Sequence, residues 1–205
     1  DVFQKFYNHV EARSNSIAMF LLLVGSLLTG LGFIFLLPPF EGFDETAHYS
    51  YVQQVSKTGT FPRLNDPISA EIEQYLEVAP GALALNSKWS YKSFFNSTPD
   101  TIDAGRKVLE RRYRDQEWVA GNGTNWEGQH PPLYYVLLAP LYRISNEWNL
   151  KAQLSFLRSA SYAIAWAGLL VIVLSYRRSG RSVNSSGGFA VGAGLCAALV
   201  PVWFR

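Results

Sequence analysis

The chain has 205 residues, a formal charge of +2 at pH 7 and 48% hydrophobic residues, and 15% of all residues are aromatic. This length suits one ordinary domain or a small membrane unit. The near-balanced charge excludes the strongly basic surface on which nucleic-acid binding depends, and a single cysteine, Cys196, excludes an intrachain disulfide.

Three apolar segments predict membrane spans. Residues 17–37 contain no charged side chain, and about 20 apolar residues are enough to cross the hydrocarbon core of a bilayer. They lack the small-residue cleavage pattern of a signal peptide, so a retained span is expected. Residues 159–176 and 187–204 are the second and third expected spans. The fold class expected is therefore an α-helical integral membrane protein, with about three transmembrane helices and a large, mostly helical extracytoplasmic loop.

Basic residues beside these segments predict the orientation in the membrane. Lys5 and Arg13 lie in residues 1–16, and three arginines lie in the link 177–186. Short cytoplasmic loops carry an excess of Lys and Arg. We therefore expect a multi-pass protein with a cytoplasmic N-terminus and link, in which residues 38–158 form an extracytoplasmic loop.

Several helices are expected inside this loop. Composition and start signals such as Pro99 predict helices at residues 44–57, 68–78 and 99–118. The Gly- and Asn-rich residues 119–130 are typical of a loop. Residues 131–144 are apolar but too short to span a bilayer, which favours a helix lying on or dipping into the outer leaflet.

The first candidate site follows the first apolar segment, in EGFDETAH (41–48). On a helix starting near Asp44, Asp44 and His48 are four residues apart, and Glu45 and His48 are three apart, so all three side chains could share one patch. Two carboxylates and an imidazole can act as a general base or hold a divalent cation. Alternatively, Asp44 caps the helix, Glu45 interacts with its dipole, and His48 is a solvated neighbour.

The second candidate site is NWEGQHPPLYY (125–135). Here Trp126, Glu127, Gln129 and His130 precede two prolines and the expected interfacial helix. One interpretation is a polar rim presented beside the first patch. The other is a helix start signal combined with an aromatic membrane anchor.

Three stretches together resemble a known family. After the first apolar segment come PPFEGFDETAHYSYVQQV (38–55), GQHPPLYYVLLAPLY (128–142) and LSFLRSASYAIAWAGLLVIVLSYRR (154–178). They resemble the N-terminal part of multi-span glycosyltransferases of the GT-C fold, of the bacterial protein mannosyltransferase and lipid A aminoarabinose transferase type. The resemblance covers most of the chain, from about residue 17 to residue 204.

The resemblance implies transfer of a sugar from a polyprenyl-phosphate donor to an acceptor, at the extracytoplasmic face of a bacterial inner or plasma membrane. It implies that Asp44 is the catalytic base and Glu45 its partner, and that Asp44, Glu45 and His48 could bind a divalent cation. His48, Gln129, His130 and Tyr134 are the expected substrate contacts. Family members have many more spans, so this chain is expected to be either a fragment of a longer transferase, inactive alone, or a short relative that serves another role.

Two other classes of protein stay open on the residues. One is a non-catalytic membrane scaffold, which would bind the lipid bilayer and partner membrane subunits of a larger complex. The other is a transporter or sensor fragment whose outer loop binds a ligand. In all three interpretations the basic and acidic residues of the loop are similar in number, so no nucleic-acid partner is expected.

Overall fold

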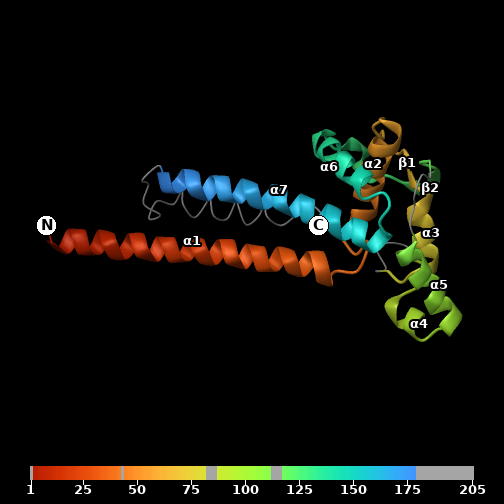
Figure 1. Ribbon diagram of the computed structural model, residues 1–205, viewed down its shortest axis with the longest axis horizontal. Helices are drawn as coiled ribbons and strands as arrows, with labels where there is room; N and C mark the ends of the chain where they lie inside the picture. Colours follow the sequence, from red (N-terminus) through yellow and green to blue (C-terminus); the bar gives the residue numbers. More distant parts are fainter. Residues whose placement is uncertain (1, 43, 82–86, 112–116, 179–205) are drawn as a thin grey trace. The chain divides into compact units, whose positions relative to one another are not determined.

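The computed structural model describes residues 2–42, 44–81, 87–111 and 117–178 (Figure 1). These residues are mostly helical. The elements follow in the order α1 (Val2–Leu36), α2 (Glu45–Thr58), β1 (Pro67–Ser69), α3 (Ala70–Val78), α4 (Tyr91–Phe95), α5 (Pro99–Glu110), β2 (Ala120–Thr124), the short 3-10 helix η2 (Trp126–Gln129), α6 (Leu133–Ile144) and α7 (Leu150–Arg178). They divide into two compact units. The first joins α1 to the part of α7 from Tyr162 onward, and the second runs from Leu37 to Ser161.

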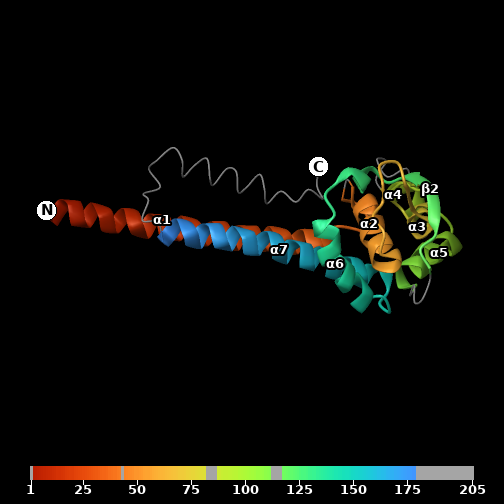
Figure 2. The ribbon, with the colours of Figure 1, turned by 90° about the horizontal axis from the view of Figure 1, so that it is seen from above.

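In the first unit, α1 and the second part of α7 lie side by side (Figures 1 and 2). They approach closely at Gly30, where an added Cβ atom would collide with the ring of Tyr162. The Tyr162 hydroxyl donates a hydrogen bond of 2.6 Å to the carbonyl oxygen of Ser26. A glycine here lets an aromatic ring reach the backbone of the facing helix, as small residues do in packed membrane helices.

One segment of α1, Ile17–Leu36, is long and apolar enough to cross a membrane, and it is the only such segment in the part of the chain that the structure describes. It coincides with the span expected at residues 17–37. The span expected at 159–176 lies inside α7, which begins earlier, at Leu150. The span expected at 187–204, with Cys196 and most of the link 177–186, lies outside the described residues.

The core of the second unit is built around α2, which packs along α6 (Figures 1 and 2). Aromatic rings fill much of this contact. Tyr51 stacks on Tyr135 with ring centroids 3.5 Å apart, and Tyr49 meets Tyr142 edge to face at 5.7 Å. Further buried members are Phe40, Val52, Val55, Ile72, Tyr75, Leu138, Leu150, Leu154 and Leu157. Polar residues of α2 are buried as well, so they need partners inside the unit.

The helices expected in the loop are present, with different ends. α2 runs from Glu45 to Thr58 and ends at Gly59, whose left-handed backbone (φ 70) suits a residue without a side chain. α3 starts later than expected because its first residues belong to β1. α5 stops at Glu110, since Arg111 has an extended backbone. α6 leaves Leu133 and Ile144 exposed, so its outer face is apolar as an interfacial helix requires.

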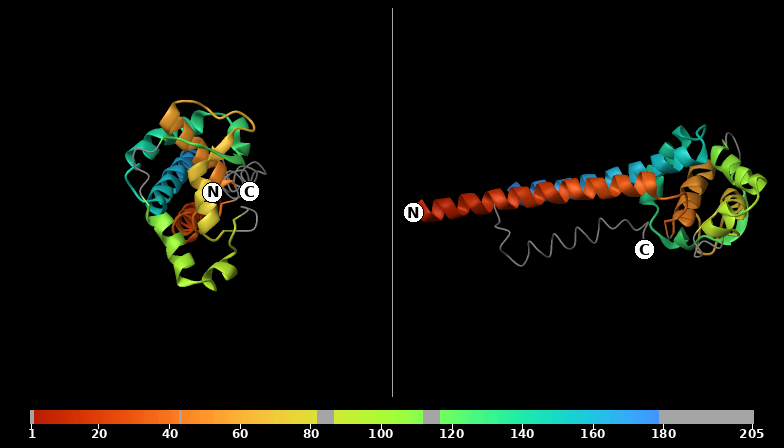
Figure 3. Two further views of the ribbon diagram at one scale, coloured as in Figure 1. Left: turned by 90° about the vertical axis from the view of Figure 1, so that its right-hand side faces the viewer. Right: turned by 90° about the horizontal axis from the view of Figure 1, so that it is seen from below.

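The expectation of a loop at residues 119–130 is wrong, because Ala120–Thr124 forms β2 and pairs antiparallel with β1. Local propensity argues against a strand here, but tertiary contacts override it. An added Cβ on Gly121 would lie 2.6 Å from the Glu73 carboxyl carbon, so glycine permits close approach to α3. α3 packs in turn against α5, which contacts α4 (Figure 3). η2, which follows β2, contacts α2.

Candidate functional site

The candidate site begins at the first turn of α2, where Asp44 holds the N-cap position. Aspartate is among the best N-cap residues, yet the Asp44 side chain makes no capping hydrogen bond. Its backbone carbonyl accepts the usual first hydrogen bond of the helix, from the His48 N–H at 3.0 Å. Burial raises the pKa of Asp44, and the charge of His130 lowers it. The carboxylate therefore lies within electrostatic range of His130 and is not used to close the helix end.

Asn125 fixes η2 against this turn. It is fully buried, and its side-chain oxygen accepts a 3.0 Å hydrogen bond from the Glu127 N–H. Its side-chain nitrogen donates to the Ala47 carbonyl of α2 at 3.3 Å, and its backbone N–H donates to the Asp66 carbonyl at 2.7 Å. A buried asparagine bonded on three sides is a rigid support. Asn125 therefore fixes the position of the Glu127 backbone beside α2.

Glu127 is the centre of the site and is only 5% exposed. Its Oε2 atom lies 2.7 Å from Nδ1 of His130, 3.6 Å from Nδ1 of His48 and 3.5 Å from the Tyr135 hydroxyl. Burial raises the pKa of Glu127, the charge of His130 lowers it, and the negative charge of Asp44 raises it further. Two carboxyl groups that repel each other and share one imidazole form an arrangement in which a proton can be exchanged.

His48 contributes to the site as a neutral ring. Its Nδ1 atom is 2.9 Å from the Tyr135 hydroxyl, which itself reaches toward Glu127. Burial lowers the pKa of His48 to about 3, and the charge of His130 adds to this effect. With a neutral His48, the network fits an Nδ1–H donated to the Tyr135 oxygen and the Tyr135 O–H donated to Glu127.

Tyrosine rings from α2 and α6 enclose these polar groups. Tyr51 stacks on Tyr135, and its hydroxyl donates to the His130 carbonyl oxygen at 3.4 Å. Burial raises the pKa of Tyr135, and so does the neighbouring Glu127 charge. Tyr135 therefore stays protonated and acts as a hydrogen-bond relay between His48 and Glu127.

Glu45 does not join this site. It is buried, and both of its carboxylate oxygens accept hydrogen bonds of 2.6 Å from the guanidinium group of Arg158 on α7. The same guanidinium donates to the carbonyl oxygens of Leu37 and Pro38 at 2.7 and 2.8 Å. The expectation that Glu45 shares a patch with Asp44 and His48 is therefore not met. Glu45 anchors the chain leaving the apolar segment to α7.

The other residues expected from the sequence separate into two groups. His130 lies in the site, as described above. Gln129 is exposed, and the Tyr134 hydroxyl lies 2.7 Å from the Ser161 hydroxyl, on the side of α6 that meets α7. Sequence reasoning named Glu127 only as a member of the polar rim, without a role of its own, and it did not single out Tyr135, although both lie inside the NWEGQHPPLYY segment. The only feature of the sequence that pointed to them was their closeness to His130. Their neighbours in the segment share that feature, so it could not distinguish them.

A divalent cation held by Asp44, Glu45 and His48 would require Glu45 to leave Arg158. Across the described ranges, no group of three or more His, Cys, Asp or Glu side chains is arranged to hold a metal ion. The donor set of this site, two carboxyls, two imidazoles and a phenol, is suited to moving protons.

Comparison with known proteins adds no relative: no family model, curated protein or solved structure matches the chain. What the fold and the site define is a helical unit with a buried carboxylate and imidazole cluster, which follows directly on a helix apolar enough to span a membrane.

Proposed function

We propose that this chain is part of a membrane glycosyltransferase, which transfers a sugar from a polyprenyl-phosphate donor to an acceptor at the extracytoplasmic face. The observation that carries the proposal is the Asp44 carboxylate, which does not cap its helix and lies within electrostatic range of His130 and Glu127. The candidate span Ile17–Leu36 ends a few residues before Asp44 in the chain, which supports a reaction close to the membrane surface.

In the proposed reaction, the acceptor hydroxyl gives its proton to Asp44 while its oxygen attacks the anomeric carbon of the sugar. The bond from that carbon to the phosphate oxygen breaks, and the polyprenyl phosphate leaves with the bonding electrons. A general base works best when its pKa is near the working pH. Burial moves the pKa of Asp44 upward in that direction, while the charge of His130 favours the ionised form that accepts the proton.

The test is sugar transfer by the intact protein in isolated membranes, with radiolabelled polyprenyl-phosphate mannose and glucose as donors. General base catalysis contributes roughly 100- to 10,000-fold, so Asp44→Asn should reduce transfer by about that factor. The matched control is Asp103→Asn, an exposed carboxylate on α5 that pairs with Lys107, and it should transfer at the wild-type rate. Wild-type transfer by Asp44→Asn would refute the base assignment, and no transfer by the unaltered protein from either donor would refute the transferase proposal.

A second function, a scaffold subunit, is favoured by a different observation. The outer face of α6 exposes Leu133 (70%), Leu137 (53%) and Ile144 (66%), which could be covered by lipid or by a partner membrane subunit. Under this function the polar cluster only stabilises the fold. Charged substitutions at Leu137 would then abolish co-purification of the partner subunit, while Asp44→Asn would leave it unchanged.

A further inference from the structure

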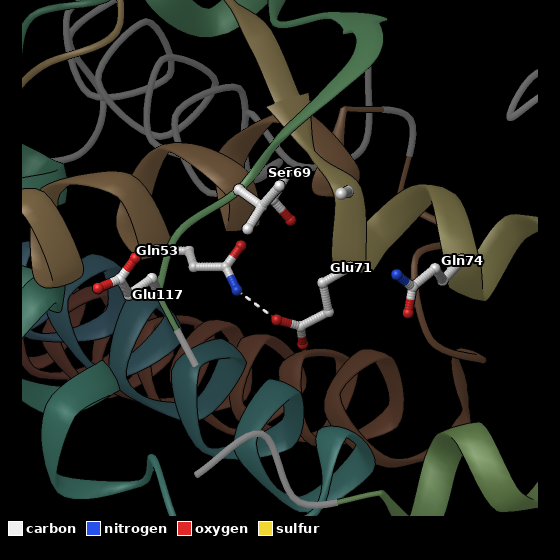
Figure 4. A pocket seen from close by; sticks show the side chains of 7 residues that line it. Gln53, Ser69, Glu71, Gln74 and Glu117 are labelled. Atoms are coloured by element: carbon white, nitrogen blue, oxygen red, sulfur yellow. Dashed lines mark hydrogen bonds between the residues drawn. The ribbon is translucent and has the colours of Figure 1, made fainter. Parts of the chain in front are cut away.

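The Glu127 site leaves two features of the second unit without a role. One is a cavity of about 110 Å³ beside the middle of α2, shown in Figure 4, where the Gln53 amide donates to the Glu71 carboxylate. A few water molecules fill a polar space of this size, so the cavity indicates no particular ligand. The other feature is the linker Leu37–Gly42, which joins the apolar segment to the turn that contains Asp44.

Side chains from three helices hold this linker. Arg158 of α7 binds its first two carbonyl groups, at 2.7 and 2.8 Å. The Tyr75 hydroxyl of α3 donates to the third carbonyl oxygen, at 3.4 Å. The Tyr91 hydroxyl of α4 donates to the Glu41 carboxylate at 2.8 Å. The path of the linker is therefore fixed by the unit around it.

Phe40 gives the linker a sharp bend with an unfavourable backbone. The Glu41 N–H donates to the Pro38 carbonyl oxygen at 3.3 Å, which closes a four-residue turn with Phe40 as its third residue. There Phe40 has φ 62°, in the left-handed region. A positive φ at this position is typical of a type II turn, in which glycine is the usual residue. A bulky residue keeps such a conformation only when its surroundings enforce it.

The packing of the Phe40 ring holds this conformation. The residue is fully buried, and its ring meets the Tyr49 ring of α2 edge to face at 5.4 Å and the Tyr75 ring of α3 at 5.0 Å. Aromatic pairs in this geometry attract each other beyond the effect of their buried area. A glycine here would permit the bend, but it would permit many other paths as well. Phenylalanine with a buried ring restricts the chain to one path.

The bend leads the chain into a second turn, which contains Asp44. The Gly42 carbonyl oxygen accepts a 3.1 Å hydrogen bond from the Glu45 N–H, so Asp44 is the third residue of this turn. Its φ of −115° and ψ of 14° are close to the values of that position in a type I turn, about −90° and 0°. By contrast, the N-caps Ser90 and Thr98 have ψ 158° and 153°, and both side chains accept a capping hydrogen bond. Asp44 therefore lacks the extended backbone with which N-cap side chains bond to their helix.

We propose that Phe40 is a positioning residue for Asp44: its buried ring fixes the two turns and thereby keeps the Asp44 carboxylate from capping α2. A carboxylate that caps a helix accepts backbone N–H bonds, which stabilise its ionised form and make it a weaker base. Burial raises the pKa of Asp44 instead, and this suits the proton acceptor of the proposed transfer. The inference rests on the proposed function only for the use of Asp44 as a base.

The test is a double-mutant cycle in the denaturant unfolding of the full-length protein in detergent. Phe40→Gly removes the ring and widens the choice of backbone conformations, so it releases the linker. Asp44 should then adopt the extended form and cap α2. Asp44→Ala should therefore raise the unfolding equilibrium constant about fivefold more in the Phe40→Gly background than in the wild type, which is the typical effect of losing an N-cap side chain.

Thr98→Ala is the matched control, because Thr98 already caps α5 in the wild type through a 3.4 Å bond from the Thr101 N–H. Its cost should be the same in both backgrounds. If Phe40→Gly does not fold, Phe40→Leu takes its place, since leucine fills most of the space but makes neither edge-to-face contact. The extra cost of Asp44→Ala should then be at least about twofold, the low end for an N-cap.

In the transfer assay, Phe40→Gly should lower kcat about fivefold and leave KM unchanged, because capping and proton transfer would compete for one carboxylate. Equal costs of Asp44→Ala in both backgrounds would overturn the proposal, since the ring would then not control the conformation of Asp44. An unchanged kcat beside a positive cycle would overturn the positioning role. Absence of transfer by the unaltered protein would refute the proposed function instead, and the unfolding cycle would still decide whether Phe40 controls the conformation of Asp44.

Discussion

Loss of one partner from the contact between Arg158 and Glu45 should strongly destabilise the second unit. The guanidinium group donates four hydrogen bonds of 2.6–2.8 Å, two to the Glu45 carboxylate and one each to the carbonyl oxygens of Leu37 and Pro38. The side chains of Arg158 and Glu45 are only 11% and 3% exposed. Replacing Arg158 by methionine keeps the apolar stem but leaves a buried carboxylate without its counter-charge.

Loss of one partner from a buried ion pair typically costs about 3–5 kcal/mol, because the remaining charge stays desolvated. For a domain of this size, 1 kcal/mol corresponds to roughly 3–5 °C in Tm. We therefore expect Arg158→Met to lower the midpoint of thermal unfolding by about 10–20 °C. Arg158→Lys should recover only part of this loss, because an ammonium group cannot bind both carboxylate oxygens and two carbonyl groups in one plane.

The assay is thermal unfolding of the full-length protein in detergent, followed by near-ultraviolet circular dichroism. Lys107→Met is the matched control, since Lys107 forms an exposed pair with Asp103 on α5 and should leave the midpoint unchanged. The double variant Glu45→Met with Arg158→Met should unfold at a higher temperature than Arg158→Met alone, because no buried charge remains. A midpoint for Arg158→Met equal to that of the wild type would refute the reasoning.

Three further predictions concern the residues around the two polar sites. Burial lowers the pKa of His48 from 6.5 to about 3. Between these two pH values the folded state binds fewer protons than the unfolded state. The free energy of unfolding should therefore fall as the pH drops, by about 1.4 kcal/mol per pH unit. The pKa of Glu71 is raised from 4.5 to about 7, so Glu71 stabilises the folded state as the pH drops and opposes the effect of His48. The loss of stability should therefore be steepest in Glu71→Gln, with Tm measured from pH 7 to pH 4. A flat profile in that variant would contradict the His48 assignment. Tyr135→Phe removes a hydroxyl that bonds His48 and should cost about 1–3 kcal/mol in denaturant unfolding, and a cost near zero would mean that the relay is not formed. Gly128→Ala places a Cβ against the Arg63 backbone carbonyl and should destabilise by about 1–3 kcal/mol in the same assay, whereas wild-type stability would show that η2 is free to shift.

Local signals in the sequence were sufficient for most helices. Three signals predict helices from their own segment alone. They are the apolar run before Leu37, Pro99 at the first turn of α5 and Gly59 after α2. The helices they delimit are present, but only α2 lies within one residue of the expectation at both ends; α5 ends eight residues before the expected end, and α1 begins at Val2. Ala120–Thr124 was missed because its strand character comes from pairing with β1, about fifty residues earlier in the chain. No local propensity encodes that pairing.

The polar contacts of the site were harder to predict than the helices. Glu127 reaches His48 and Tyr135 only because Asn125 holds η2 against α2 by bonds to Ala47 and Asp66. None of these partners is a neighbour in the sequence. Spacing within a segment can indicate which side chains share a face, but it gives no information about which distant segment will cover that face.

The first turn of α2 shows how far spacing can be used. Successive residues on a helix are rotated by about 100°, so two adjacent carboxylates face different neighbours. Asp44 and His48, four residues apart, share a direction, and His130 interacts electrostatically with both of them. Glu45 faces Arg158, whose position on α7 is 113 residues away. Two adjacent carboxylates are therefore expected to have different roles, one in chemistry and one in stabilising the fold. Glu45 is anchored by Arg158 and stabilises the fold, whereas Asp44 has no such anchor and is the candidate for chemistry.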